Sequence, residues 1–146
     1  MLKHYMDAVS LIERLHRQFL DVVKAELDSL GVRDINNVQA LILFNVGDKQ
    51  LTVGELTARG YYLGSNVSYN LKKMVESGYL EQARSAHDRR AVNVHLSQKG
   101  ASLWDELNGM FARHADKLAT GSVTTAGLDA AQQALRGLER FWDRTH

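Results

Sequence analysis

Hydrophobic residues recur every three or four positions over the first thirty residues of the chain. This spacing places them on one face of an α-helix, because the helix completes a turn in 3.6 residues. The set comprises Leu2, Tyr5, Met6, Val9, Ile12, Leu15, Phe19, Val22, Val23, Leu27 and Leu30. The pattern therefore predicts one long amphipathic helix that ends at Gly31.

A second helix is predicted directly after a capping signal. Asn36 suits the N-cap position, and Gln39 stands three residues later, as in a capping box. The segment 38–44 that follows is apolar nearly all round, so this helix should be central and buried. Gly47-Asp48 should end it.

Residues 51–58 fit two local structures, a short strand and a brief helix, and Thr52 could belong to either. Leu51-Thr52 has the composition of a short strand, and Thr52 can also cap a brief helix over 53–58, with Glu55 at its third position. A turn is expected over 60–64, where the chain reads Gly-Tyr-Tyr-Leu-Gly.

A further helix is predicted from about Ser65 to Ser77, closed by Gly78. Three apolar residues at i, i+4 and i+7 should form its buried face, namely Val67, Leu71 and Met74. The opposite face carries hydroxyl, amide, phenol and ammonium groups, which leaves it polar and exposed.

Two strands should then form an antiparallel hairpin. Residues 79–83 read as the first strand, 85–90 as the connecting loop, and 92–96 as the second strand, because apolar Val92, Val94 and Leu96 alternate with polar residues. Ser97 should cap the helix that follows.

Two helices complete the chain. The first has core positions at Leu103, Trp104, Leu107 and Phe111 and is broken at Gly121-Ser122. The last begins near Thr125 and has an apolar stripe of Leu128, Ala131, Leu135, Leu138, Phe141 and Trp142. This order of elements predicts a mostly α fold with a small antiparallel β wing: a winged helix-turn-helix domain plus a helical region.

Composition narrows the functional class. The chain has 146 residues and no cysteine, which excludes disulfides, thiolate nucleophiles and cysteine-ligated zinc. It has no apolar run of membrane-spanning length, and Glu13, Arg14 and Arg17 interrupt the first helix, so we expect neither a signal peptide nor an anchor and assign the chain to the cytoplasm.

Charge is concentrated in the middle of the chain. Residues 59–99 hold seven lysines and arginines against three acidic residues, a formal charge of +4, whereas the whole chain carries +1. Such a segment indicates a local anionic partner, although charged runs are usually only solvated faces.

The segment 88–100, Asp-Arg-Arg-Ala-Val-Asn-Val-His-Leu-Ser-Gln-Lys-Gly, resembles the wing signature of the MarR family of winged-helix transcription factors. The resemblance extends over essentially the whole chain through the order of its elements. It implies a homodimer that binds a pseudo-palindromic operator, and we expect a repressor. It also implies a division into dimerisation helices (1–34 and 115–146), a DNA-binding domain (35–100) and a linking helix (101–114).

The resemblance assigns DNA contacts to two segments. In the recognition helix they are Ser65, Asn66, Ser68, Tyr69, Lys72 and Lys73, and in the wing Arg84, Asp88, Arg89 and Arg90. Arg90 is expected to enter the minor groove, braced by Asp88, while Arg89 meets phosphate. Tyr69 and Asn70 depart from the family pattern, which commonly has a basic or small residue and an apolar residue there.

Family members often bind small phenolic or carboxylic effectors between the dimer helices and the DNA-binding lobe. The resemblance therefore implies an effector pocket lined by His16, Phe19, Phe44 and Trp104. Each of these residues could equally be an ordinary core residue. No other cofactor, no metal and no enzymatic activity are expected. The six histidines do not pair at i, i+4, and no phosphate loop or nucleophile motif occurs. Two alternatives stay open: a winged-helix protein–protein interaction module, and a metal-responsive regulator.

Overall fold

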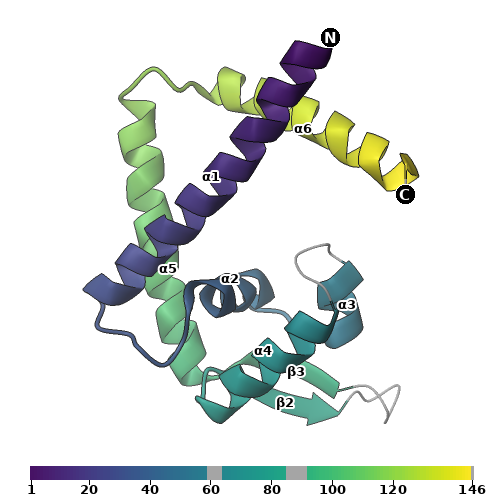
Figure 1. The fold of residues 1–146 in the computed structure, drawn as a ribbon. Coiled ribbons are helices and arrows are strands. Elements are labelled where there is room, and N and C mark those ends of the chain that lie inside the picture. Colours follow the sequence, from purple (N-terminus) through teal and green to yellow (C-terminus); the bar gives the residue numbers. More distant parts are fainter. Residues whose placement is uncertain (59–63, 85–91, 146) are drawn as a thin grey trace. The chain divides into compact units, whose positions relative to one another are not determined.

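The computed structural model describes residues 1–58, 64–84 and 92–145, with the backbone alone at residues 64 and 65. The order of elements is α1 (Leu2–Ser29), α2 (Asn37–Val46), β1 (Leu51–Thr52), α3 (Val53–Ala58), α4 (Gly64–Glu76), β2 (Leu80–Arg84), β3 (Val92–Leu96), α5 (Gln98–Ala119) and α6 (Thr125–Thr145) (Figure 1). The chain forms two compact units, Met1–Leu107 and Asn108–His146. The predicted fold class is confirmed, whereas the functional division into dimerisation and DNA-binding segments stays a prediction.

Helix α1 ends where the sequence predicts. Gly31 follows it with a φ of 71°, a left-handed conformation that glycine adopts without strain. Its buried residues are Val23 and Leu27, near its C-terminal end. The side chain of Asn37 donates a 3.1 Å hydrogen bond to the Leu20 carbonyl and so ties α1 to the start of α2.

Helix α2 forms the centre of the first unit. The predicted capping box is confirmed: Asn36 accepts from the Gln39 amide at 2.8 Å, and the Gln39 side chain accepts from the Asn36 amide at 3.1 Å. Its buried residues come from every side of the helix, namely Gln39, Ala40, Leu41, Ile42, Leu43 and Val46. The helix ends at Gly47, as expected, where φ is 55°.

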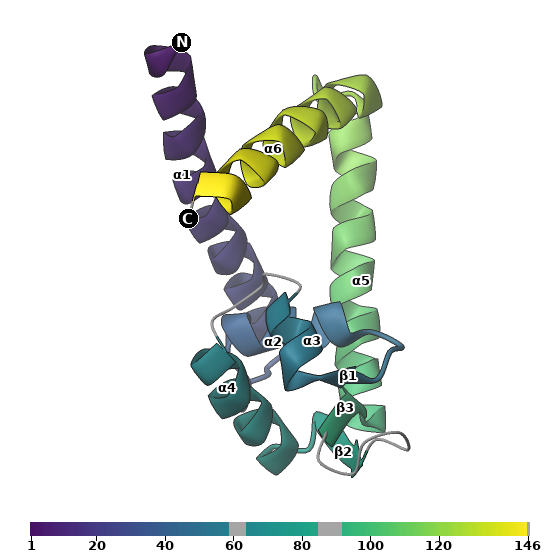
Figure 2. The same ribbon diagram turned by 90° about the vertical axis from the view of Figure 1, so that its right-hand side faces the viewer.

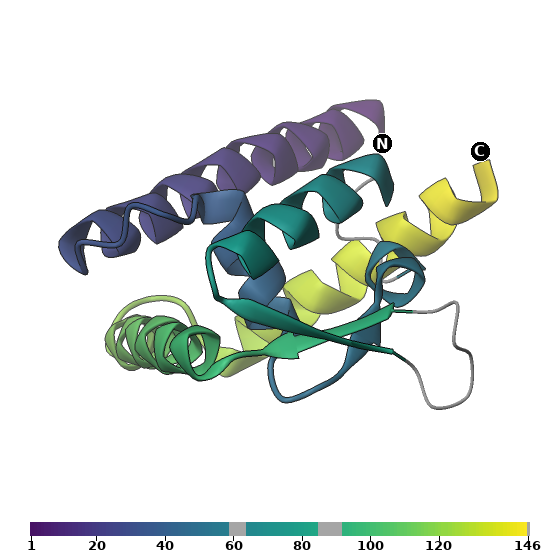
Figure 3. The same ribbon diagram turned by 90° about the horizontal axis from the view of Figure 1, so that it is seen from below.

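The sheet has one strand more than the predicted hairpin. Its order is β1-β3-β2, and both pairings are antiparallel (Figures 2 and 3). The predicted hairpin is confirmed, and Leu51-Thr52, for which the sequence allows a short strand, adds the third strand by pairing with Val94 and Asn93. Thr52 serves both roles that its sequence allows, since its hydroxyl also accepts from the Glu55 amide at 3.0 Å and caps α3.

The strand β2 begins one residue later than predicted, because the Tyr79 amide donates to the Met74 carbonyl at the end of α4. Tyr79 is buried, and its hydroxyl donates to Asp34 at 2.5 Å. Lys99 donates to the other oxygen of Asp34 at 2.7 Å and lies over the Tyr79 ring, 4.3 Å from its centroid. These three residues join the α1–α2 connection to the sheet and to the first turn of α5.

The start of α5 packs tightly against the start of β2. Ser97 accepts from the Gly100 amide at 3.1 Å, as predicted for a cap, and donates to the Gly78 carbonyl at 2.5 Å. Gly100 is buried, and a Cβ there would lie 2.2 Å from the Tyr79 carbonyl oxygen. Only glycine therefore fits this crossing without displacement of the backbone.

The second unit contains the end of α5 and the whole of α6. Thr124 caps α6 through a 2.9 Å hydrogen bond from the Gly127 amide. No described residue of α6 is buried, and its large apolar side chains stand about half exposed at Leu128, Leu135 and Phe141. Among the described residues, no helix is long and apolar enough to cross a membrane.

Candidate nucleic-acid interface

Helix α4 has one buried and one exposed face, as its sequence predicts. Val67, Leu71 and Met74 are at most 3% exposed and pack into the core of the first unit. The predicted contact residues lie on the other face, where Asn66, Ser68, Tyr69, Lys72 and Lys73 are all exposed. Ser65 belongs to the same helix, but its side chain lies outside the described part. The exposed face therefore presents donors and acceptors that suit base edges and phosphates.

The two lysines of this face differ in their surroundings. The ammonium of Lys73 lies 3.8 Å from Glu76 and 5.7 Å from the centroid of the Tyr69 ring. Lys72 forms no ion pair with any described residue. Because the Lys73 pair is half exposed, it contributes little to stability, yet it holds the Lys73 side chain along the helix and beside Tyr69.

Asn70 is a polar residue of α4 whose role the sequence did not explain. It sits at the edge of the α4 core and accepts a 3.2 Å hydrogen bond from the Gln39 side-chain amide. Gln39 is itself 8% exposed and completes the α2 capping box. The buried amide thus connects the N-terminus of α2 to α4. The only signal in the sequence was a polar residue where the family pattern is apolar.

The wing is described at its base. Arg84 ends β2 on the exposed side and pairs in register with Val92, the first residue of β3. The three remaining wing positions, Asp88, Arg89 and Arg90, lie outside the described residues, so their assigned contacts stay predictions. Across the two strands, His95 lies 3.1 Å from Glu81.

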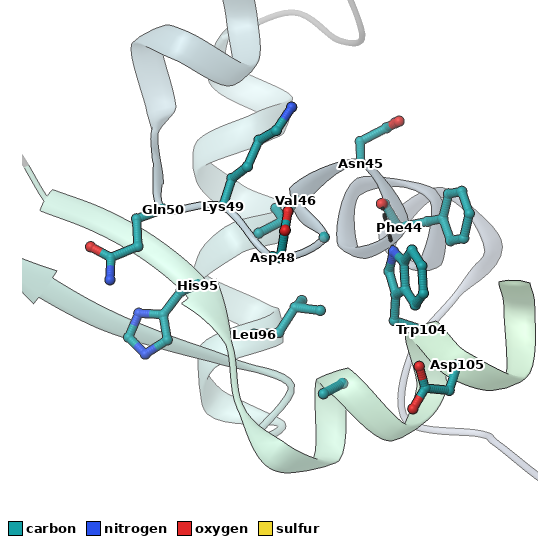
Figure 4. Close-up of a pocket in the computed structure, with 12 residues that line it drawn as sticks. Phe44, Asn45, Val46, Asp48, Lys49, Gln50, His95, Leu96, Trp104 and Asp105 are labelled. Atoms are coloured by element: carbon teal, nitrogen blue, oxygen red, sulfur yellow. Dashed lines mark hydrogen bonds between the residues drawn. The ribbon is translucent and has the colours of Figure 1, made fainter.

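The predicted effector residues separate into two groups. Phe44 and Trp104 stack with 5.2 Å between ring centroids and 9° between ring planes, and the Trp104 indole donates to the Phe44 carbonyl at 3.1 Å. Both line a cavity of about 700 Å³ (Figure 4). His16 and Phe19 lie on α1 and do not line this cavity. No cluster of three or more potential metal ligands occurs in the described ranges.

Comparison with known proteins agrees with this geometry. A sequence profile described as the MarR family matches residues 33–91. The exopolysaccharide II synthesis transcriptional activator ExpG of Rhizobium meliloti (strain 1021) is 37% identical over 138 residues, which cover 94% of this chain and 71% of that protein.

Two structures of DNA complexes have the same fold. The Streptococcus pneumoniae FabT–DNA complex has a TM-score of 0.77 at 19% identity, covering 97% of this chain and 99% of that one. The S. aureus MepR–DNA complex has a TM-score of 0.74 at 18% identity, with 90% and 96% covered. The expectation of a transcriptional regulator rather than an enzyme is confirmed by the family and the relative. The chain belongs to the MarR family of transcriptional regulators.

Proposed function

We propose that this protein regulates transcription in the cytoplasm by binding an operator as a homodimer. Helix α4 enters the major groove, and the wing reaches the adjacent minor groove through Arg90. The observation that carries the proposal is the exposed face of α4, where five side chains with polar groups project from a helix whose opposite face is fixed in the core. Because its opposite face is packed in the core, the helix is held in a fixed orientation. The major groove of DNA admits one α-helix, so the exposed side chains can contact base edges there.

The proposed contacts divide by their chemistry. Asn66, Ser68 and Tyr69 offer hydrogen bonds and an aromatic edge to bases, whereas Lys72 offers a point charge to phosphate. Arg84 stands at the base of the wing beside the second strand, where it suits a phosphate next to the minor groove. The +4 formal charge of residues 59–99 supports an anionic partner for this surface.

A second copy of the chain is the proposed partner of the terminal helices. Helix α1 leaves Met6, Leu15 and Phe19 between 42% and 56% exposed, and α6 leaves Leu135 and Phe141 47% and 54% exposed. Large exposed apolar stripes are uncommon on the helices of a monomer. A two-fold dimer would present two recognition helices about 34–36 Å apart, which matches one turn of DNA and a pseudo-palindromic site.

The direction of regulation follows from where the operator lies. The sequence predicts a repressor, and the 37% identical relative is named an activator, which favours activation as the second candidate. A promoter fused to a reporter, with and without the regulator, separates the two outcomes. A small-molecule effector that lowers DNA affinity is part of the proposal.

The decisive experiment is selection of bound duplexes from a random pool, followed by anisotropy titration of the selected site. We expect a dyad-symmetric site and a log–log salt slope of roughly −5 to −9, from on the order of 6–10 phosphate contacts per dimer. Lys72→Ala should weaken binding to all duplexes alike, whereas Ser68→Ala should change sequence preference. A slope near zero would favour a protein–protein interaction module, and loss of binding on chelation would favour a metal-responsive regulator.

A further inference from the structure

A cavity of about 700 Å³ opens on the surface of the first unit, and no residue of α4 lines it. It is formed by the end of α2, the connection 47–50, the end of β3 and the first turns of α5 (Figure 4). Its volume falls in the range of about 300–1,000 Å³ that is typical of small-molecule sites. No residue of α1 or α6 lines the cavity, so it differs from the location beside the dimerisation helices that the family resemblance implies.

The apolar part of the cavity is an aromatic wall with a fixed orientation. Phe44 covers one side of the Trp104 ring, and the indole N–H is already donated to the Phe44 carbonyl. Trp104 therefore has no further donor to offer a ligand, and what remains is the π surface of its ring. Val46, Leu96 and Ala101 add aliphatic surface beside it.

The charged part of the cavity is mainly acidic. Asp48 and Asp105 both line it, and neither carboxylate forms an ion pair with a described residue. Lys49 also lines the cavity, but Figure 4 shows its side chain extending away from Asp48 and Asp105. His95 lies 3.1 Å from Glu81 through its Nε2 and forms no ion pair with either aspartate.

We propose that this cavity binds an organic cation with a flat aromatic body. Cations are attracted to the face of an indole ring, and two carboxylates that line the same cavity reinforce this preference. A carboxylate or phenolate ligand would instead meet two negative charges and no donor from Trp104. The proposal deepens the effector part of the proposed function, since it gives the effector site a place and a charge.

The test uses three probes with one ring system and different charges: 1-naphthylmethylammonium, 1-naphthalenemethanol and 1-naphthoate. Binding to the full-length protein without DNA is measured by calorimetry and by the indole N–H resonances of its two tryptophans. We expect the ammonium to bind at least tenfold more tightly than the alcohol, to shift the Trp104 resonance more than that of Trp142, and naphthoate to bind most weakly.

Variants separate the site from nonspecific attraction. The pair Asp48→Asn and Asp105→Asn should together lower ammonium affinity at least tenfold, whereas Asp116→Asn, an exposed aspartate of α5 outside the cavity, should leave it unchanged. Equal or tighter binding of naphthoate, no saturable binding of the ammonium at millimolar concentration, or unchanged affinity in the double variant would each overturn the proposal. Because no DNA is present, these outcomes are independent of whether the operator proposal holds.

Discussion

Replacement of Gly100 by alanine tests the packing that holds the wing to α5. The added Cβ would lie 2.2 Å from the Tyr79 carbonyl oxygen and 3.2 Å from its carbonyl carbon. Even close carbon–oxygen contacts are about 3.3 Å, so the two backbones must separate by roughly 1 Å. That oxygen also accepts the Ser97 amide at 3.1 Å, and movement strains or breaks this hydrogen bond.

The magnitude follows from three terms. Overpacking against a rigid group costs about 1–3 kcal/mol, and the contact here is with backbone, which places the cost at the upper end. Weakening one hydrogen bond adds about 0.5–1.5 kcal/mol. Alanine recovers at most about 1 kcal/mol of helix propensity, and less near a helix start. We therefore expect a net loss of about 2.5–3.5 kcal/mol in the free energy of unfolding.

The assay is urea unfolding followed by circular dichroism at fixed protein concentration, together with thermal melts. The loss should lower Tm by about 5–10 °C for a chain of this length. Gly54→Ala is the matched control, because a Cβ at this exposed position of α3 meets Thr52 only at an ordinary 3.8 Å. A Gly100→Ala protein as stable as the wild type would refute the packing argument.

Three other changes test other parts of the molecule. Arg90→Ala should weaken operator binding by roughly 1–3 kcal/mol without altering the melt, and wild-type affinity in an anisotropy titration would contradict the wing assignment. Removal of residues 137–146, or Trp142→Ala, should shift the protein toward monomer or aggregate in sedimentation, at a cost of about 3–5 kcal/mol if the dimer buries the ring. A stable truncated dimer would assign the contact to α1 alone. The hydrogen bonds from Lys99 and then Tyr79 hold the pKa of Asp34 below its ordinary value of 3.8, so the stability they give is present above that pH and lost as the pH falls through the lowered pKa. Asp34→Asn should therefore flatten the acid limb of the stability profile, and an unchanged acid limb would argue against the Asp34 network.

Local signals in the sequence were sufficient for most of the fold. The capping box at Asn36, the dual role of Thr52 and the stop at Gly31 each depend on residues within a few positions of one another, so their geometry follows from the chain itself. The pairing of β1 with β3 joins segments about forty residues apart, and a two-residue strand has too little periodicity to reveal its partner.

The candidate nucleic-acid interface could also be predicted in part from the sequence. The exposed face of α4 follows from the spacing of Val67, Leu71 and Met74, because burying one side of a helix exposes the other. The cavity at Trp104 could not be derived, since it depends on how α2, β3 and α5 cross in space. Periodicity marked Phe44 and Trp104 as apolar, but only the packing shows that they stack and that two aspartates line the same cavity.

The hydrogen bond between Gln39 and Asn70 has a consequence for exchanging DNA specificity between relatives. A recognition helix with leucine at this position would leave the buried Gln39 amide without its acceptor, while Gln39 would still be required by the α2 cap. An unsatisfied buried amide costs about 1–3 kcal/mol. A protein with a transplanted α4 would therefore have a lower free energy of unfolding, even if every base contact were correct. Grafting the helix therefore requires Gln39 and Asn70 to be exchanged as one unit, and a double-mutant cycle between them would measure that dependence.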